Sequence, residues 1–395
     1  MSKFRYSIEA SYINNDKADS EVEFENQYIQ SLYIDYDYDN YNTPMLYLVA
    51  NIDSKTIDYL ALNSKSTLIA LTIYKIDTSI TPAIKELYFR SFFTYFMIEN
   101  ANALHELDEQ AEDSNINKYR KRVTLGLISN DVLNRRNVLI NTVIKGNVNS
   151  IIANFTKDYP LLLENTTNKE VELVLHPMNT LTQLFNYLDS LGLLYDTPYR
   201  VFYDIDKMYL VSSSGNSIPA KGETINSVII NVLEPTNVVG LDSGMDINPD
   251  EKIYEINIDA TSVTVTNSSI TDKLYTKILG ISSDGSTKTV DLNVNQGSIS
   301  SSKIAIERIK NDNFNQLSAS KVKAELNETL VNLSKSELDS SIFTINREFH
   351  IKHEGQYKDI SGKFLLSRKC EIYIPDGAEG QFISELMLSF RKIVE

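Results

Sequence analysis

A chain of 395 residues, 42% hydrophobic and 23% charged, is long enough for two or three domains with sizeable cores and has the composition of a soluble globular protein. Its net charge of −15 argues against a sequence-blind DNA-binding protein, which needs a basic surface. The single cysteine, Cys370, excludes an internal disulfide framework, and we expect no signal peptide and no membrane insertion because no long apolar run is visible.

Residues 1–130 predict a β domain. Residues 4–12 alternate apolar and polar side chains, and 45–52, 67–76 and 119–129 are further strand candidates. The segment Leu87–Ile98 is apolar on both faces, which predicts a central strand. The polar, acidic stretch 99–118 then forms a long excursion from a hairpin, which is uncommon without a function.

Residues 131–215 predict a small α/β domain. Apolar residues recur at helical spacing from Val148 to Tyr159, and Pro160 ends that helix. A strand over 169–175 is followed by an amphipathic helix from Met178 to Leu191, with Gly192 as its C-terminal cap. The run PYRVFYDIDKMYLVSSSG (198–215) predicts a β-hairpin whose tip carries two carboxylates.

Residues 216–395 predict a second β domain. Short strands alternate with turn residues, 234–251 form a surface loop, and Ser320–Leu333 has the spacing of a helical insertion. A strand over 364–374, with one apolar side, precedes a returning strand over 382–393, which also fits a helix. The apolar side is Phe364, Leu366, Cys370, Ile372 and Ile374. The fold class is therefore mainly β, with two β domains flanking the α/β insert.

No pattern of catalytic, cofactor-binding or metal-ligating residues emerges, so we expect no catalytic residue, no cofactor and no metal site. His350 and His353 lie three apart on a predicted strand and should point to opposite faces. His105 falls in the acidic excursion and His176 before a helix. Cys370 lies in a strand and favours a packing role over a nucleophilic one.

Three charged groups are better explained by structure than by chemistry. Asp35, Asp37 and Asp39 have the spacing of a calcium loop, but Asn40 and Leu46 stand where that loop needs Gly and Glu. The loop Asp242–Asp250 also has carboxylates that could hold a cation, with equally little support from its spacing. Asp204 and Asp206 suit turn chemistry, because Asp bonds readily to nearby backbone N–H groups.

Two further surfaces are marked by charge. Lys118, Arg120 and Arg122 share one face of a strand, which is usually a solvated face but would fit an acidic partner. The acids between residues 16 and 39 predict either a solvated surface or one that repels polyanions. They are Asp16, Asp19, Glu21, Glu23, Glu25, Asp35, Asp37 and Asp39.

The α/β region resembles the middle domain of the baseplate hub proteins of contractile-tailed phages, of which the T-even hub is an example. The resemblance lies in the order of the strand over 169–175, the helix ending in LGLLY and the hairpin TPYRVFYDIDKMYLVSS. The preceding KRVTLGLISNDVLNRRNVLINTVIKGNVNSIIANFTKDY is similar too. The resemblance covers residues 119–215 and, beyond them, only the order of the domains.

The resemblance implies two tail-tube-like β-barrels, at 1–130 and 216–395, flanking an α/β domain at 131–215. It implies a homotrimer in the virion whose six barrels adapt a sixfold tail tube to a threefold central spike, assembled in the host cytoplasm beside other baseplate proteins. DNA would pass through the ring without being bound. From the charge of −15 and the eight acids between residues 16 and 39 we further expect the channel to be lined with carboxylates. The alternatives are a tail-tip receptor- or carbohydrate-binding protein and a glycan hydrolase with a carboxylate pair.

Overall fold

The computed structural model describes 23 stretches of the chain, and all structural statements below concern these. They are residues 4–14, 21–24, 26–38, 43–78, 81–98, 120–130, 140, 142–156, 161–163, 170–175, 180–195, 199–205, 208–212, 227–233, 246–248, 253–268, 277–281, 287–291, 328–336, 338–344, 347–353, 361–377 and 380–392. The acidic excursion with His105, and also His176, lie outside the described residues.

Eight strands close into a β-barrel, in the order β21-β3-β4-β7-β6-β5-β1-β22. Their bounds are β1 Phe4–Asn14, β3 Ile29–Asp37, β4 Met45–Asp53, β5 Thr67–Asp77, β6 Ile84–Ile98, β7 Arg120–Ser129, β21 Gly362–Pro375 and β22 Phe382–Lys392. Alternate side chains point inward and are buried along most of the barrel, although the first residues of β6 are exposed. An eight-stranded barrel is just wide enough for side chains to fill its interior. The barrel is therefore a packed core.

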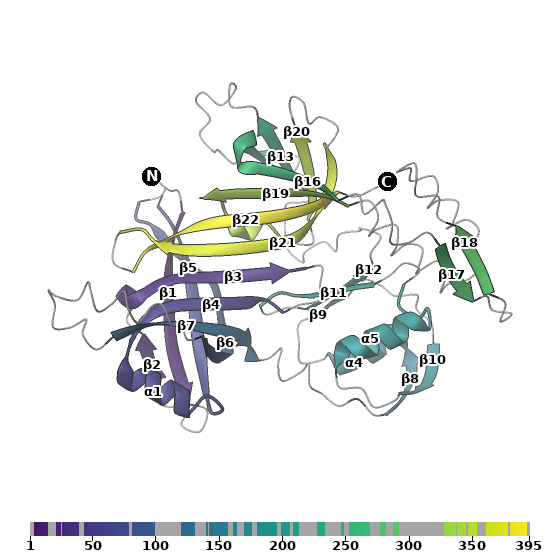
Figure 1. The fold of residues 1–395 in the computed structure, drawn as a ribbon, viewed down its shortest axis with the longest axis horizontal. Helices are drawn as coiled ribbons and strands as arrows, with labels where there is room; N and C mark the ends of the chain where they lie inside the picture. Colours follow the sequence, from purple (N-terminus) through teal and green to yellow (C-terminus); the bar gives the residue numbers. More distant parts are fainter. Residues whose placement is uncertain are drawn as a thin grey trace.

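A second sheet continues from the same hairpin, β21–β22, in the order β14-β15-β13-β20-β21-β22-β19-β16. Its other strands are β13 Ser227–Leu233, β14 Asp246–Asn248, β15 Ile253–Asp259, β16 Val263–Ser268, β19 Glu328–Ser336 and β20 Glu348–His353. Figure 1 shows the hairpin lying between this sheet and β3, β4 and β7. One hydrophobic cluster runs through both sheets.

Shorter elements complete these two sheets. Strand β2 (Glu21–Phe24) pairs with β1, and helix α1 (Ser54–Leu62) joins β4 to β5. The side chain of Asp53 caps α1 by accepting a hydrogen bond from the backbone N–H of Thr56 at 3.0 Å. Three 3₁₀ turns are η1 Asn26–Tyr28, η5 Ala260–Ser262 and η7 Ser340–Ile342.

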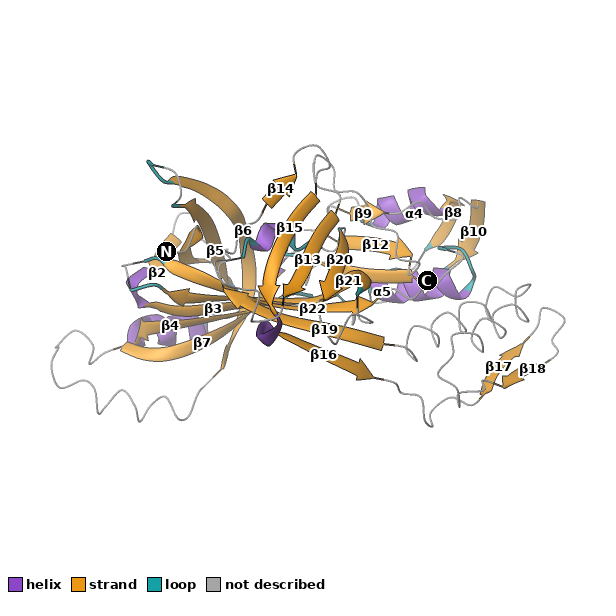
Figure 2. Cartoon of the chain, turned by 90° about the horizontal axis from the view of Figure 1, so that it is seen from above, coloured by secondary structure: helices purple, strands orange, loops and turns teal. Residues whose placement is uncertain are grey.

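A smaller α/β unit has its own hydrophobic cluster. It contains β8 Val143–Asn147, α4 Val148–Phe155, β9 Leu161–Leu163, β10 Glu170–Val174, α5 Leu181–Ser190, β11 Tyr199–Tyr203 and β12 Met208–Ser212. Both predicted helices are confirmed, and Gly192 adopts the left-handed φ of +64° that ends α5. Figure 2 shows this unit and the separate hairpin of β17 (Lys277–Ile281) and β18 (Thr287–Asp291) away from the barrel.

Two local predictions are wrong. The helix predicted for Ser320–Leu333 is a strand where it is described, because Glu328–Ser336 pairs with β16 and β22 as β19. Strand β6 has a neighbouring strand on each side, β5 and β7, as expected of a central strand. Only its inward face, however, is covered by other side chains. Phe93 and Tyr95 are buried, whereas Phe92 and Phe96 on the opposite face are each 43% exposed.

The mainly β fold class with an α/β unit is confirmed. The domain boundaries predicted at residues 130 and 215 stay predictions. The strand pairing shows, in addition, that the two β regions are not separate sheets. The closed barrel takes β21 and β22 from the C-terminal part of the chain. The two β parts therefore share a hairpin.

Candidate functional site: the joint between the barrel, the second sheet and the α/β unit

The hairpin tip that carries Asp204 inserts an apolar side chain into the main core. Strands β11 and β12 pair in the register Tyr203 with Met208, and Asp204 and Ile205 begin the connection between them. The carboxylate of Asp204 accepts a hydrogen bond from the backbone N–H of Ile205 at 3.1 Å. Ile205 is only 5% exposed and belongs to the core cluster of the two sheets, whereas Val201 and Tyr203 of β11 belong to the cluster of the α/β unit. The tip is thus an anchor of the α/β unit, while Asp206 lies outside the described residues.

A β-bulge in β21 creates the second part of the joint. The register of β21 against β22 shifts between Leu366 and Arg368. Before the bulge, β21 pairs with β20 of the second sheet, and after it with β3 of the barrel. Because the extra residue reverses the alternation of side chains, Lys369 and Glu371 point inward. The bulge therefore marks where one strand passes from one sheet to the other.

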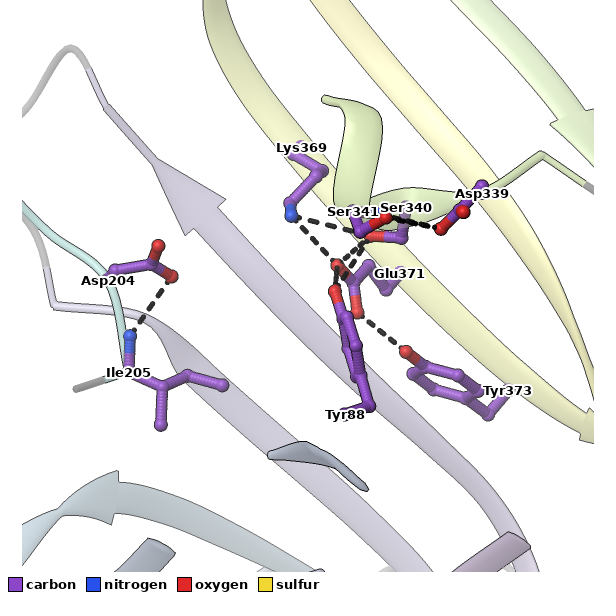
Figure 3. A network of polar contacts seen from close by, with 9 residues as sticks. All are labelled: Tyr88, Asp204, Ile205, Asp339, Ser340, Ser341, Lys369, Glu371 and Tyr373. Carbon is purple, nitrogen blue, oxygen red and sulfur yellow. Dashed lines mark hydrogen bonds and ion pairs between the residues drawn. The ribbon is translucent and has the colours of Figure 1, made fainter. Parts of the chain in front are cut away.

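The inward-pointing residues form a buried ionic cluster centred on Glu371, which is fully buried (Figure 3). The Lys369 ammonium lies 2.9 Å from its carboxylate. Tyr88 and Tyr373 donate their hydroxyls to it at 2.9 and 2.7 Å, and Ser340 donates a third hydroxyl. These partners come from β6, η7 and β21. The cluster therefore ties the barrel to the turn that leads into the second sheet.

A neighbouring ion pair strengthens the same connection. The Lys75 ammonium of β5 pairs with the Asp339 carboxylate, which also accepts from the backbone N–H of Ser341 at 3.1 Å and so caps η7. The Lys75 ammonium lies 4.2 Å from the ring centroid of Phe4, in a cation–π contact. The Lys75–Asp339 ion pair and the hydrogen bond from Ser340 to Glu371 thus hold η7 against the barrel.

The electrostatics favour the ionised form of Glu371. Burial alone raises the pKa of a carboxyl, but the Lys369 ammonium and the hydroxyls of Ser340 and Tyr373 outweigh it, so the pKa of Glu371 lies below its usual 4.5. Burial, followed by the charge of Glu371, raises the pKa of Tyr88 and Tyr373 well above 10. The tyrosines therefore stay protonated as hydrogen-bond donors.

This arrangement suits a structural role. A buried ion pair contributes little net stability compared with apolar residues of the same size, yet losing one partner is costly. What it can contribute is a defined strand register, since only one alignment of β21 places Lys369 and Glu371 among their partners. The cluster is therefore a device that fixes how the two sheets join.

Other residues that the sequence singled out are dispersed. His350 and His353 point to opposite faces of β20 as predicted, with His353 buried among the core residues of that strand. Asp35 is held by Arg368 through two hydrogen bonds of 2.8 and 2.7 Å. Within the described stretches, no three His, Cys, Asp or Glu side chains are grouped so that they could hold a metal ion.

The predicted buried side of β21 is partly wrong. Phe364 and Leu366 are buried, but after the bulge Cys370 and Ile372 face outward and Ile374 is 42% exposed. Burial raises the pKa of the half-buried Cys370 thiol to about 11, so it stays protonated and poorly nucleophilic. Sequence reasoning missed Lys369 and Glu371 because alternation places them on the solvent side; two opposite charges in an apolar strand were the available signal.

The pKa of Glu371 predicts an acid-dependent stability. Because its folded-state pKa lies below 4.5, its ionisation stabilises the folded state above that pH, and the contribution is lost as the pH falls through the lowered value. We expect the difference in unfolding free energy between the wild type and Glu371→Gln to shrink as the pH falls below the usual carboxyl pKa and through the lowered pKa of Glu371. Urea unfolding at several pH values measures it, and a constant difference would contradict the assignment.

Comparisons with known proteins agree with this architecture. The model of the family described as bacteriophage PBS1 gene 109 protein matches residues 1–392. No curated protein matches the chain. Among solved structures, a tail protein from Neisseria meningitidis MC58 superimposes with a TM-score of 0.54 at 9% identity, covering 98% of this chain and 96% of that one. The 43 kDa tail protein of prophage MuSo2 from Shewanella oneidensis gives a TM-score of 0.50 at 8% identity, covering 98% and 97%.

At these identities the structural likeness establishes a shared fold. It runs through both sheets and the α/β unit, because nearly the whole of each chain is aligned. The phage-tail type of fold that the sequence resemblance implied is therefore confirmed. Among the described helices, none has the length and apolar character needed to cross a bilayer. Since the family model matches nearly all of its residues, the chain belongs to the family of the bacteriophage PBS1 gene 109 protein.

Proposed function

We propose that this chain is a structural protein of the phage tail baseplate, a hub that forms a ring between the sixfold tail tube and the threefold central spike. The observation that carries the proposal is the match of nearly the whole chain to the fold of two tail proteins, one of them from a prophage. Three copies, each with two β parts, form the ring, and closed cyclic symmetry is the usual solution for such assemblies. The partners are the tube, the spike and other baseplate proteins of the virion, which is assembled in the host cytoplasm.

The packed barrel supports a ring of several copies. Its interior is filled by large side chains, among them Tyr6, Ile8, Leu48 and Phe93, each no more than 1% exposed. DNA could not pass through a single barrel, because a filled eight-stranded barrel has no channel. A passage for DNA therefore has to lie between copies. The buried joint suits this role, since each copy must present its two β parts at a fixed angle.

The channel is proposed to carry net negative charge so that DNA slides through unbound. Phosphates bind basic walls by releasing counterions, which would slow transit. Of the acids between residues 16 and 39, Glu23 is exposed on β2, whereas Asp35 is neutralised by Arg368. Asp16, Asp19, Glu25 and Asp39 lie outside the described residues. The proposal therefore rests on the charge of −15 and on the exposed Glu23.

We further propose that the chain is not an enzyme. The Lys369–Glu371 pair is enclosed in the core, the Lys75–Asp339 pair is largely buried, and both have structural partners, which supports a scaffolding use of these charges. Turnover of peptidoglycan or polysaccharide by the purified chain, abolished by substituting one acidic residue, would instead favour the glycan hydrolase. Specific binding to cell-surface glycans from the tip of the tail would favour the receptor-binding alternative.

The symmetry of the assembled particle tests the proposal. We expect electron micrographs of tails to show three copies of this chain in a closed ring around the tail axis. Rings of two or six copies, or a position at the periphery of the tail, would contradict it. Isolated rings should bind double-stranded DNA weakly and without the steep salt dependence of a basic surface. Tight, salt-sensitive binding would refute the acidic channel alone.

A further inference from the structure

The outer surface of β6 carries a stripe of apolar side chains. Leu87 is 60% exposed, and Phe92 and Phe96 are each 43% exposed. Phe92 and Phe96 lie an odd number of residues from the buried Phe93, so they point away from the barrel interior. Leu87 points the same way, because the register of β6 against β5 shifts by one residue between Leu87 and Phe89. We call Leu87, Phe92 and Phe96 the β6 stripe.

A second apolar patch lies on the outer surface of β3, β21 and β22, which run side by side (Figure 1). Tyr33 is 38% exposed, Ile374 42% and Met387 49%. Ile372 connects them, because it is partly exposed and pairs in register with Tyr33. We call Tyr33, Ile372, Ile374 and Met387 the β21 patch. Exposed apolar groups on the outside of a barrel whose interior is already packed are typical of protein contact surfaces.

The two surfaces lie on opposite sides of the barrel. From β6 the strand order reaches β21 through β7, β4 and β3, and also through β5, β1 and β22. Both paths take four steps around the eight-stranded barrel, so β6 and β21 face away from each other. One copy therefore cannot bring its own two surfaces together, whereas two copies in a head-to-tail arrangement can.

Each surface contains a charge that no described residue pairs, and the two charges are opposite. Arg90 is exposed on the outer side of β6, between Leu87 and Phe92 along the strand. Glu385 is partly exposed on the outer side of β22. Its carboxylate accepts a hydrogen bond from the hydroxyl of Ser334 at 2.9 Å but lies beside no cation within the described stretches. The guanidinium and the carboxylate are thus available to a partner.

Neighbouring charges are already neutralised within one copy. Beside the β6 stripe, the Lys85 ammonium lies 3.0 Å from the Glu9 carboxylate. Beside the β21 patch, the Arg368 guanidinium lies 2.7 Å from the Asp35 carboxylate. These ion pairs leave Arg90 as a positive charge within one apolar surface and Glu385 as a negative charge beside the other. Apolar area with a complementary charge pair is what a specific protein contact requires.

We propose that the β6 stripe of one copy binds the β21 patch of the next copy, with Arg90 of the first opposite Glu385 of the second. The inference rests on the proposed hub function and names the surfaces through which the copies of the ring would meet. The apolar side chains provide the buried area, and the charge pair fixes the register. Because the two surfaces differ, the contact is head-to-tail and forms a closed ring when the rotation between copies allows it.

Charge exchange on the purified full-length chain tests the proposed contact by sedimentation equilibrium. We expect Arg90→Glu to raise the dissociation constant of self-association roughly 100-fold, because it places two carboxylates opposite each other. Glu385→Arg should have a similar effect, and the double variant should restore association. Met387→Ser should weaken association roughly tenfold. The controls Lys65→Glu and Leu62→Ser change an exposed cation and an 84% exposed leucine outside both surfaces, and should change nothing.

Cross-linking in assembled tails tests the same contact without relying on association in solution. A chain with Leu87→Cys and Met387→Cys, in which Cys370→Ser removes the native thiol, carries one thiol in each surface. We expect a short bismaleimide to link its copies into dimers and trimers. Chains with only one of the two introduced cysteines should stay unlinked, because the contact joins different surfaces.

The outcomes separate this inference from the proposed function. Absence of the cross-link in assembled tails would overturn the contact, and so would a double charge variant that associates no better than Arg90→Glu. Closed rings of three copies in micrographs of the same tails would then still support the hub. A cross-link to a different tail protein in place of a second copy would also overturn the contact. The expected cross-link in tails without a closed axial ring would support the contact and contradict the hub.

Discussion

Replacing Lys369 by methionine is expected to lower the free energy of unfolding by about 3–5 kcal/mol. Methionine retains most of the length of the lysine side chain but leaves the Glu371 carboxylate in the core without its counter-ion. That carboxylate is fully buried, and three hydroxyl donors cannot replace a positive charge at 2.9 Å. Urea denaturation of the wild type and the variant at neutral pH measures the effect.

The neighbouring residue offers a matched control. Arg368 lies on the same strand and pairs with Asp35, but 58% of its side chain is exposed. We expect Arg368→Met to cost less than about 1 kcal/mol, because exposed ion pairs contribute little. The double variant Lys369→Met/Glu371→Leu should recover part of the loss, since no unpaired charge is left. If Lys369→Met cost no more than Arg368→Met, the cluster would not be the structural joint described above.

Replacing Ile205 by alanine is expected to destabilise the attachment of the α/β unit by about 2–4 kcal/mol. Ile205 is 5% exposed and is a contact of that unit with the core of the two sheets. Shortening it leaves a cavity that the turn cannot fill, because Asp204 already holds the Ile205 backbone N–H. Calorimetry should show the α/β unit unfolding in a transition of its own, separate from that of the barrel.

Leu188→Ala distinguishes attachment from internal stability. Leu188 on α5 is fully buried within the core of the α/β unit itself. We expect this variant to lower hydrogen-exchange protection throughout that unit while the barrel strands keep theirs. In Ile205→Ala the unit should keep its own protection, and the loss should appear at the turn and at the end of β3. Equal patterns in the two variants would argue against an anchoring role for the hairpin tip.

Lys369→Met and Ile205→Ala both test the fixed geometry between units that the proposed hub requires. A ring that joins parts of different symmetry needs each copy to hold its units at constant angles. Here the angle between the two sheets depends on a bulged strand with a buried ion pair, and the α/β unit is held by an inserted isoleucine. Both devices are local, so their loss should affect assembly before it affects the fold of the individual units.

How far the sequence predicts this architecture depends on whether the signal is local. Helices α4 and α5 follow from apolar residues at helical spacing and from Gly192, and hairpin β11–β12 follows from alternation around a polar turn. The prediction of a helix at Ser320–Leu333 was wrong because the structure of that segment is decided by pairing with distant strands. Leu330 and Leu333 have helical spacing, but β16 and β22 on either side make that segment a strand. Neighbouring strands override local periodicity because they supply both hydrogen bonds and burial.

The sequence by itself determined the alternation of β and α/β regions, the fold type implied by the aromatic and aliphatic pattern of residues 119–215, and the turn at Asp204. Only the tertiary structure decided which face of each strand is covered. Alternation predicts Lys369 and Glu371 on the solvent side, but a bulge between Leu366 and Arg368 turns them into the core. Likewise, residues 87–98 are apolar on both faces, yet the curvature of a closed barrel encloses only the inner one. Whether a side chain faces the barrel interior or the solvent depends on how the sheet closes. That closure is set by pairing between strands far apart in the sequence, so the local sequence pattern does not predict it.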